Sequence, residues 1–189
     1  VGLVGSEMCI RDSAKAMGLD MIQGDHEDAP GQLELNWTYD NVLRNADRLS
    51  TYRQICAQVA REHGLIACFM TKPFMGVSAS GCHTNMSLWK GGKIKVNKLG
   101  NKKLPGVEEV FSYVEGGTYT FMPDNKDMQL PGKVGLQSIA GIMKHLPALT
   151  ALGSSTVNSY RRLWDQGFWA PVYACLLYTS DAADDYRSV

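Results

Sequence analysis

Residues 25–37, DHEDAPGQLELNW, decide how the chain around them folds. Glu27 and Glu34 flank a proline-glycine turn, and polar residues alternate with apolar ones over residues 32–37. This alternation is the period of a half-buried strand, with Glu34 on its polar face. We predict a hairpin in which residues 18–23 pair with residues 32–37. Both carboxylates then point into one small volume, where they repel each other unless a proton or a cation lies between them.

A second informative stretch, residues 81–88, reads GCHTNMSL. We predict a strand on which His83, Asn85 and Ser87 share one face, because alternate side chains of a strand point the same way. An imidazole together with two carboxylates can hold a divalent cation, and polar groups beside it can contact a ligand. The stretch therefore supplies the remaining half of a possible cation site.

A guanidinium suited to a carboxylate lies later in the chain, at Arg162 in the segment NSYRR. Each of these residues, taken alone, also fits a structural role. His83 fits a core histidine, Arg162 an ion-pair partner and Glu34 a charge on an edge strand. Their order along the chain, and not any one of them, favours a functional site.

Five segments in this order resemble the glutamine synthetase family: HEDAPGQLE, FMTKPF, SGCHTNMSL, IMKHLPALTAL and TVNSYRRL. The resemblance covers residues 14–174 and implies an α+β fold, a fragment of the catalytic domain with an antiparallel curved sheet and helices packed on its outer face. Residues 91–132 correspond to a variable insertion with no assigned chemistry. Nothing in their lysines requires a phosphate site, because a basic loop is ordinarily a solvated surface.

The resemblance implies a cytoplasmic enzyme of nitrogen assimilation that works as a homo-oligomeric ring. Members of the family transfer the γ-phosphoryl group of ATP to the side-chain carboxylate of L-glutamate, and ammonia then displaces phosphate from the γ-glutamyl phosphate. Phosphoryl transfer between two anions needs cations to neutralise the gathering charge, which explains Mg²⁺ or Mn²⁺ as cofactor.

The family's functional residues match positions of this sequence. Glu27 and Glu34 match ligands of the metal nearer glutamate and ammonia, and His83 matches a ligand of the metal that bridges the ATP phosphates. Arg162 matches the catalytic arginine that binds the substrate carboxylate. The remaining matches are the ATP-contacting segment, Asn85, Met86 and Ser87, and the glutamate-binding pair, Ser78 and Ala79.

Three departures from the family pattern bear on the substrate. Asn85 stands where many members have a second histidine, and Ser78-Ala79 replaces an Asn-Gly pair. Trp169 stands where well-known bacterial members have a glutamate that takes a proton from ammonium, and an indole cannot act as a base. Ammonia is the expected amine, with methylamine or another small amine as the alternative. A non-catalytic relative is the second alternative.

The two ends of the chain read as translated adapter. MCIRDS (residues 8–13) can be encoded by ATGTGTATAAGAGACAG, and the reverse complement of that string encodes CLLYTS, which is residues 175–180. We therefore predict that residues 1–13 and 175–189 are not native and that the chain is a gene fragment. We expect it to be inactive alone, since two carboxylates and one histidine cannot build two cation sites.

Composition excludes several classes of partner. The whole chain has no net charge, and the two ends carry two basic and five acidic residues, so the remainder has a net charge of +3. This is too mild to indicate nucleic acid or an anionic membrane. No apolar run approaches the ~18 residues of a membrane-spanning helix. Three cysteines remain between the ends, without metal-ligand spacing, and favour a reducing cytosol over disulfides.

Other elements are predicted from periodicity. We expect a surface helix from Asp40 to Gly64 with one buried stripe, formed by Val42, Ala46, Leu49, Tyr52, Ile55 and Val59. A core helix begins near Val134 and is kinked or restarted at Pro147. Besides these helices we expect a buried strand over residues 65–70, a loop over residues 71–80 and a strand within residues 117–122.

Overall fold

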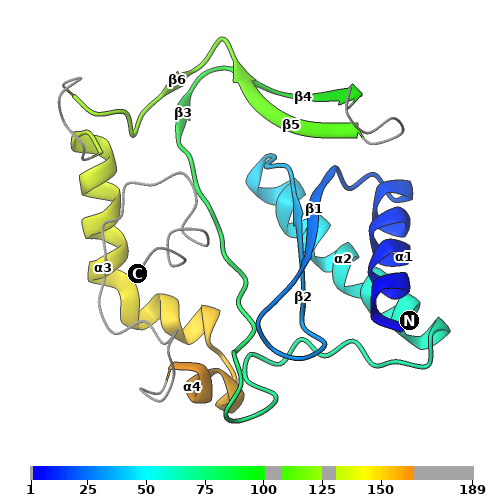
Figure 1. Cartoon of the computed structure of the whole chain (residues 1–189). Helices are drawn as coiled ribbons and strands as arrows, with labels where there is room; N and C mark the ends of the chain where they lie inside the picture. Colours follow the sequence, from blue (N-terminus) through cyan, green and yellow to red (C-terminus); the bar gives the residue numbers. More distant parts are fainter. Residues whose placement is uncertain (1, 101–107, 125–130, 164–189) are drawn as a thin grey trace. The chain divides into compact units, whose positions relative to one another are not determined.

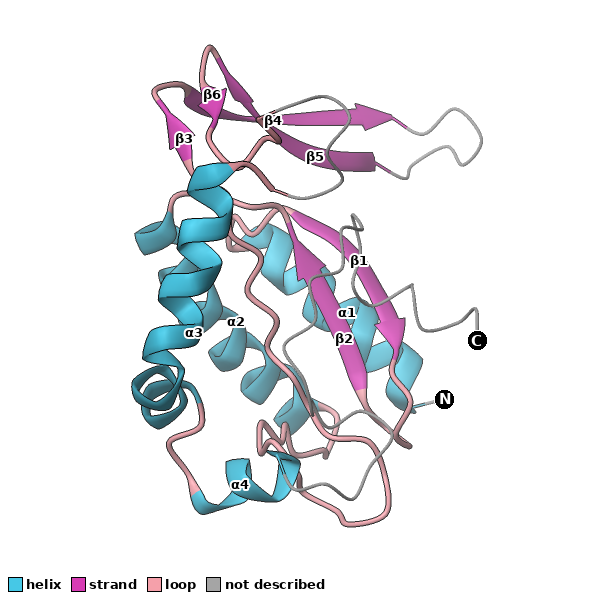
Figure 2. Ribbon diagram, turned by 90° about the vertical axis from the view of Figure 1, so that its left-hand side faces the viewer, coloured by secondary structure: helices cyan, strands magenta, loops and turns pink. Residues whose placement is uncertain are grey.

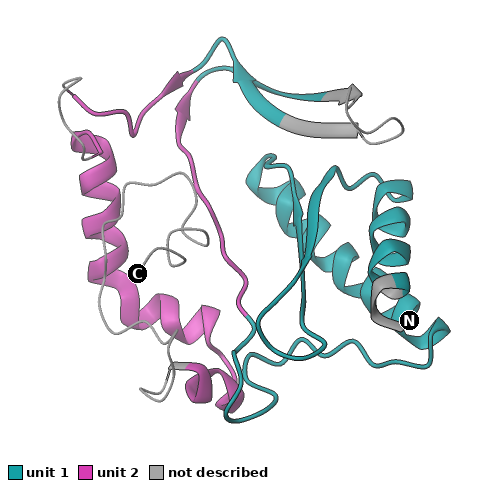
Figure 3. Ribbon diagram, viewed as in Figure 1, with its two compact units in different colours: residues 1–80, 91–117 teal, residues 81–90, 118–189 magenta. Residues whose placement is uncertain are grey.

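The computed structural model describes residues 2–100, 108–124 and 131–163 (Figure 1). The chain divides into two compact units, residues 1–80 with 91–117 and residues 81–90 with 118–189, and each is considered by itself (Figure 3). The elements in chain order are α1 (Gly2–Ala16), β1 (Met21–His26), β2 (Leu33–Trp37), α2 (Val42–Glu62), β3 (Trp89–Lys90), β4 (Lys93–Gly100), β5 (Glu108–Glu115), β6 (Thr118–Tyr119), α3 (Lys133–Gly153) and α4 (Val157–Leu163).

The predicted hairpin around the proline-glycine turn is present in the first unit. β1 and β2 pair antiparallel with Asp25 opposite Glu34. The turn is closed by the backbone N–H of Gln32, which donates to the carbonyl of Ala29 at 3.0 Å. Gly31 has φ of 75°, a backbone conformation that glycine adopts without steric cost. The first strand begins at Met21 and ends at His26, later than the predicted 18–23.

The core of this unit lies between the hairpin and two helices, α1 and α2, which pack on the same side of it (Figures 1 and 2). Burial of apolar surface there stabilises the unit by about 1.5–3 kcal/mol for each large side chain. The buried cluster consists of Ile10, Ala14, Leu19, Met21, Leu35, Ile55, Cys56 and Val59. Ile10 of α1, which lies in the predicted adapter segment, thus packs in the core, and the adapter origin of that segment stays a prediction.

Helix α2 has the predicted ends but only half of the predicted buried stripe. Asn41 caps its N-terminus, where its Oδ1 accepts a hydrogen bond from the N–H of Leu43 at 3.1 Å. Gly64, with φ of 68°, follows its C-terminus. Val42 is 79% exposed, whereas Ile55 is buried. The buried stripe is confined to the second half, because that is where α1 and the hairpin cover the helix.

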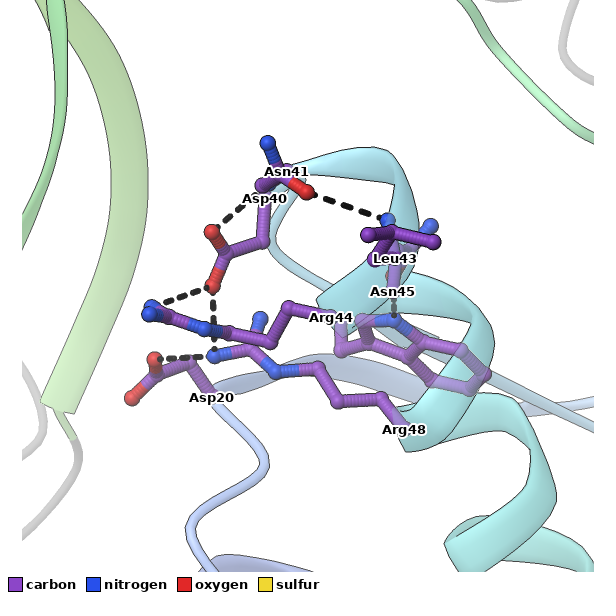
Figure 4. A network of polar contacts seen from close by, with 8 residues as sticks. Asp20, Asp40, Asn41, Leu43, Arg44, Asn45 and Arg48 are labelled. Carbon is purple, nitrogen blue, oxygen red and sulfur yellow. Dashed lines mark hydrogen bonds and ion pairs between the residues drawn. The ribbon is translucent and has the colours of Figure 1, made fainter.

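Arg48, in the first half of α2, is part of a polar network (Figure 4). Arg48 Nη2 lies 3.1 Å from Asp40 Oδ2 and 3.4 Å from Asp20 Oδ2. Arg44 Nη1 lies 3.1 Å from the same Asp40 oxygen. In the same region, Trp37 Nε1 donates to Asn45 Oδ1 at 2.6 Å. The network joins the open end of the hairpin to the first turns of the helix.

Residues 91–132 contain more regular structure than the single predicted strand. β4 and β5 form an antiparallel hairpin with Lys93 opposite Glu115, and Lys95 Nζ lies 3.7 Å from Glu115 Oε2. A hydrogen bond joins the side chains of Tyr39 and Ser112 and so ties β5 to the segment after β2. The predicted strand within 117–122 corresponds to the short β6.

The second unit contains a short ladder and two helices. β3 pairs antiparallel with β6, with Trp89 opposite Tyr119. Helix α3 contains Pro147, and Figure 1 shows its axis turning in its second half, as expected of an internal proline. Its predicted core face is exposed: Leu136 is 37% and Met143 54% exposed. The helix is confirmed, but its predicted burial is wrong, since within the described part of this unit little packs on that face.

Two predicted strands are wrong. Residues 65–70 and 81–88 are in neither strand nor helix, and Ile66 is 92% exposed. A buried strand needs neighbouring strands to satisfy its N–H and C=O groups, and the described residues provide none for these segments. The described strands form three two-stranded antiparallel sheets, so a larger curved sheet is not observed. In the described ranges, no helix combines the length and apolarity that a membrane crossing requires.

Candidate functional site

The two glutamates of the hairpin share a hydrogen bond between their side chains, as their positions on either side of the turn predict. This hydrogen bond raises the pKa of Glu27, and burial raises it further; the backbone N–H of Asp28, which donates to Glu27 Oε2 at 3.1 Å, lowers it. The negative charges of Glu34 and Asp28 raise it again. A proton or a cation between the two carboxylates would relieve their mutual repulsion.

The pair is chemically suited to a divalent cation, because carboxylate oxygens are ligands that Mg²⁺ and Mn²⁺ prefer. Asn36 Nδ2 donates to Glu34 Oε1 at 3.0 Å and so holds one of the two carboxylates in place. Among the described residues, no group of three or more His, Cys, Asp or Glu side chains is placed to hold a metal ion. Two carboxylates alone are too few ligands for such a cation, so a metal site at this pair would need further ligands.

The turn of the hairpin is bonded to residues 78–80, the segment of the predicted glutamate-binding pair. Gln32 Nε2 donates to the carbonyl of Ala79 at 3.1 Å and to Ser80 Oγ at 3.3 Å. Ser78 Oγ donates to Asp28 Oδ2. The structure therefore brings Ser78 and Ala79 beside the turn whose flanks carry the carboxylate pair.

The loop that ends in this segment is closed on itself. The backbone N–H of Ser80 donates to the carbonyl of Thr71 at 2.8 Å, and Lys72 Nζ donates to the carbonyl of Val77 at 2.5 Å. Gly76 has φ of 79°, in the left-handed region that glycine tolerates. This loop is the one predicted for residues 71–80.

Within the second unit, His83 and Arg162 lie beside each other. A Cβ atom added to Gly81 would lie 3.2 Å from Nε2 of His83 and 3.5 Å from Nη2 of Arg162. Arg162 is half-buried in α4, whose N-terminus is capped by Thr156, and His83 is exposed. Two predicted site residues, 79 positions apart in the sequence, are thus neighbours, and glycine leaves the space between them open.

The predicted ATP-contacting segment is exposed. Asn85, Met86 and Ser87 are all at the surface, and Ser87 Oγ accepts a hydrogen bond from Trp89 Nε1 at 3.0 Å. His83 belongs to a different unit from Glu27 and Glu34, so the convergence of these three on one cation pocket stays a prediction. Trp169 lies outside the described residues.

Four residues of the site were missed by the sequence reasoning. Asp28 and Gln32 bond the turn to residues 78–80, Asn36 holds a carboxylate, and Gly81 separates an imidazole from a guanidinium. A local signal existed for the first three only, since they are polar residues on the turn or on the Glu34 side of the strand. Their partners could not be inferred from spacing.

The chain is similar to known proteins both in sequence and in structure. The family model "Glutamine synthetase, catalytic domain" matches residues 6–180, a range that takes in parts of both end segments. A glutamine synthetase of Rhizobium leguminosarum bv. phaseoli is 37% identical over 158 residues, which is 84% of this chain and 30% of that protein. A glutamate–methylamine ligase of Methyloversatilis universalis is 34% identical over 171 residues, 88% of this chain and 33% of that protein.

A solved structure described as "Apo GmaS without ligand" superposes with a TM-score of 0.60 at 28% identity and covers 84% of this chain and 32% of its own. A second, described as "GmaS/ADP complex-Conformation 1", gives a TM-score of 0.59 at 30% identity, over 82% of this chain and 30% of its own. The chain spans about a third of the length of the relatives that it matches. The chain belongs to the glutamine synthetase family and carries part of its catalytic domain.

Proposed function

We propose that the full-length protein containing this chain is an ATP-dependent ligase that forms an amide at the γ-carboxylate of L-glutamate with ammonia, through γ-glutamyl phosphate. The observation that carries the proposal is the hydrogen-bonded pair Glu27–Glu34 on a turn that is bonded to residues 78–80. A cation-binding pair beside a glutamate-binding segment is the arrangement that this reaction needs. We further propose a homo-oligomeric ring in the cytoplasm, as the family implies.

Each residue then has a physical task. Glu27 and Glu34 would hold Mg²⁺ or Mn²⁺ between their carboxylates, and His83 would ligate the metal on the ATP phosphates. When bound, these cations neutralise the negative charge that gathers as a phosphoryl group passes between two anions. Arg162 would hold and polarise the substrate carboxylate, because a guanidinium pairs with a carboxylate through two parallel hydrogen bonds.

The other proposed contacts complete the two substrate sites. Ser78 and Ala79 would hold glutamate through the backbone of their segment, which the turn keeps in place. Asn85, Met86 and Ser87 would contact ATP, where a neutral amide at position 85 donates and accepts hydrogen bonds without adding charge. Both assignments follow from the family match of these positions.

The test is phosphate release by the full-length protein in the presence of ATP, glutamate and ammonia. We expect Glu34→Gln to reduce kcat/KM more than about a hundredfold, since even changes to the outer partners of metal ligands cost about 10–100-fold. Glu62→Gln, on the exposed last turn of α2, is the matched control and should leave kcat/KM unchanged. Equal activity of the two variants would overturn the metal assignment.

Methylamine is the second candidate for the amine. The support is the 34% identity to a glutamate–methylamine ligase over 88% of this chain, together with Trp169 in the position of a catalytic glutamate. An apolar indole suits a methyl group better than a bare ammonium ion. Measuring kcat/KM of the full-length protein for ammonia and for methylamine decides between them, and a strong preference for methylamine would replace the first proposal.

We propose that the chain by itself has no ligase activity. Its carboxylate pair and one imidazole are too few ligands for two cation sites. ATP- and glutamate-dependent phosphate release from the isolated chain would contradict this. A non-catalytic relative is the remaining alternative, and it predicts that the full-length protein is inactive with every amine tested.

A further inference from the structure

The side-chain amide of Gln32 is bonded at both ends across a long sequence separation. Its Oε1 accepts a hydrogen bond from the backbone N–H of Ala29 at 3.1 Å, inside the hairpin turn. Its Nε2 donates to the carbonyl of Ala79 at 3.1 Å and to Ser80 Oγ at 3.3 Å, 47 and 48 positions away. One half-buried amide therefore joins the turn to the end of the 71–80 loop.

This connection is reinforced on either side. Ser78 Oγ donates to Asp28 Oδ2, and the backbone N–H of Ser80 donates to the carbonyl of Thr71 at 2.8 Å. Residues 78, 79 and 80 are each held by the turn or by the base of their own loop. The chain at 78–80 consequently has little freedom to move relative to the hairpin that carries the two glutamates.

We infer that Gln32 is a positioning residue for glutamate: its amide sets the place of the residue 78–79 backbone relative to the Glu27–Glu34 pair. The inference rests on the proposed function, which puts glutamate on residues 78–79 and the metal on the glutamates. Gln32 acts through these residues and touches neither substrate. Loss of its two donated hydrogen bonds loosens the glutamate site and leaves the ATP-contacting segment, residues 85–87, unaffected.

The test replaces Gln32 in the full-length protein by methionine, which keeps the volume and removes the amide without adding a charge. The variant loses all three hydrogen bonds of the amide, and we expect the KM for glutamate to rise about tenfold from the loss of the two that reach residues 79 and 80. The KM for ATP should stay within about twofold and kcat within about threefold, because chemistry and nucleotide contacts are untouched. The matched control is Gln58→Met, which removes an amide that bonds only exposed residues of α2, Glu62 and Arg61.

Either of two outcomes overturns the inference. A glutamate KM equal to that of the wild type shows that the amide does not position the site. A parallel loss of affinity for glutamate and ATP shows a structural role alone. If the variant does not fold, amide hydrogen exchange of the wild type decides: saturating glutamate must slow exchange at residues 79–80, and unchanged exchange there overturns the inference. A wild type without glutamate-dependent phosphate release contradicts the proposed function instead.

Discussion

Replacing Arg48 by methionine tests whether the polar network at the open end of the hairpin stabilises the first unit. The Arg48 side chain is 11% exposed, and its carboxylate partners Asp40 and Asp20 are 6% and 17% exposed. Arg44 contacts the same Asp40 oxygen from a side chain that is 69% exposed. Arg44 and Arg48 of α2 therefore share the partner Asp40 but differ greatly in how far their side chains are exposed.

The expected magnitudes follow from that difference. Removing one partner of a buried ion pair costs about 3–5 kcal/mol, because it leaves a carboxylate buried without its cation. We expect the lower end, about 3 kcal/mol. Arg48 Nη1 is buried without a hydrogen-bond partner among the described residues, and the substitution also removes the desolvation penalty of this group. Arg44→Met should cost only about 0.3–0.5 kcal/mol, the usual value for an exposed helical pair.

Amide hydrogen exchange of the chain, followed by mass spectrometry on peptides of α2 and of the hairpin, measures both values. A loss of about 3 kcal/mol speeds exchange through global opening roughly 150-fold, and the smaller loss about twofold. Raising the salt concentration to about 1 M should abolish the effect of Arg44→Met and leave that of Arg48→Met, since buried pairs are screened less. Equal effects of the two variants, or an Arg48→Met cost below about 1 kcal/mol, would refute the reasoning.

Three further outcomes are expected. Burial raises the pKa of the Cys56 thiol, so a maleimide should label Cys56 far more slowly than the exposed cysteines, and rapid labelling of Cys56 would contradict this. Because the folded protein keeps the thiol proton at a pH where the unfolded protein loses it, the stability of the fold should fall as the pH rises above about 9. Gly81→Ala should weaken metal-dependent ATP binding of the full-length protein by about 1 kcal/mol through a tight contact with His83, whereas Gly141→Ala, with open space around it, should not. Asn41→Ala should destabilise α2 by about 1 kcal/mol in urea denaturation, through loss of its N-cap bond.

Local patterns in the sequence were sufficient for the hairpin, for α2 and for the carboxylate pair. Alternation over residues 32–37 places Glu34 on one face, and a short turn brings it back beside Glu27. Gly64 ends α2 because a positive φ costs glycine nothing. Each of these features depends on neighbours within a few residues, so composition and spacing determine it.

Only the tertiary structure decided which distant groups meet. The amide of Gln32 reaches Ala79, Arg48 bridges Asp20 and Asp40, and a glycine lies between an imidazole and a guanidinium. Apolar runs such as residues 65–70 remain outside any strand in the described part of the chain, because a strand requires partners that periodicity cannot supply. Periodicity reports the environment that a segment prefers, whereas long-range hydrogen bonds and ion pairs depend on which segments the folded chain places side by side.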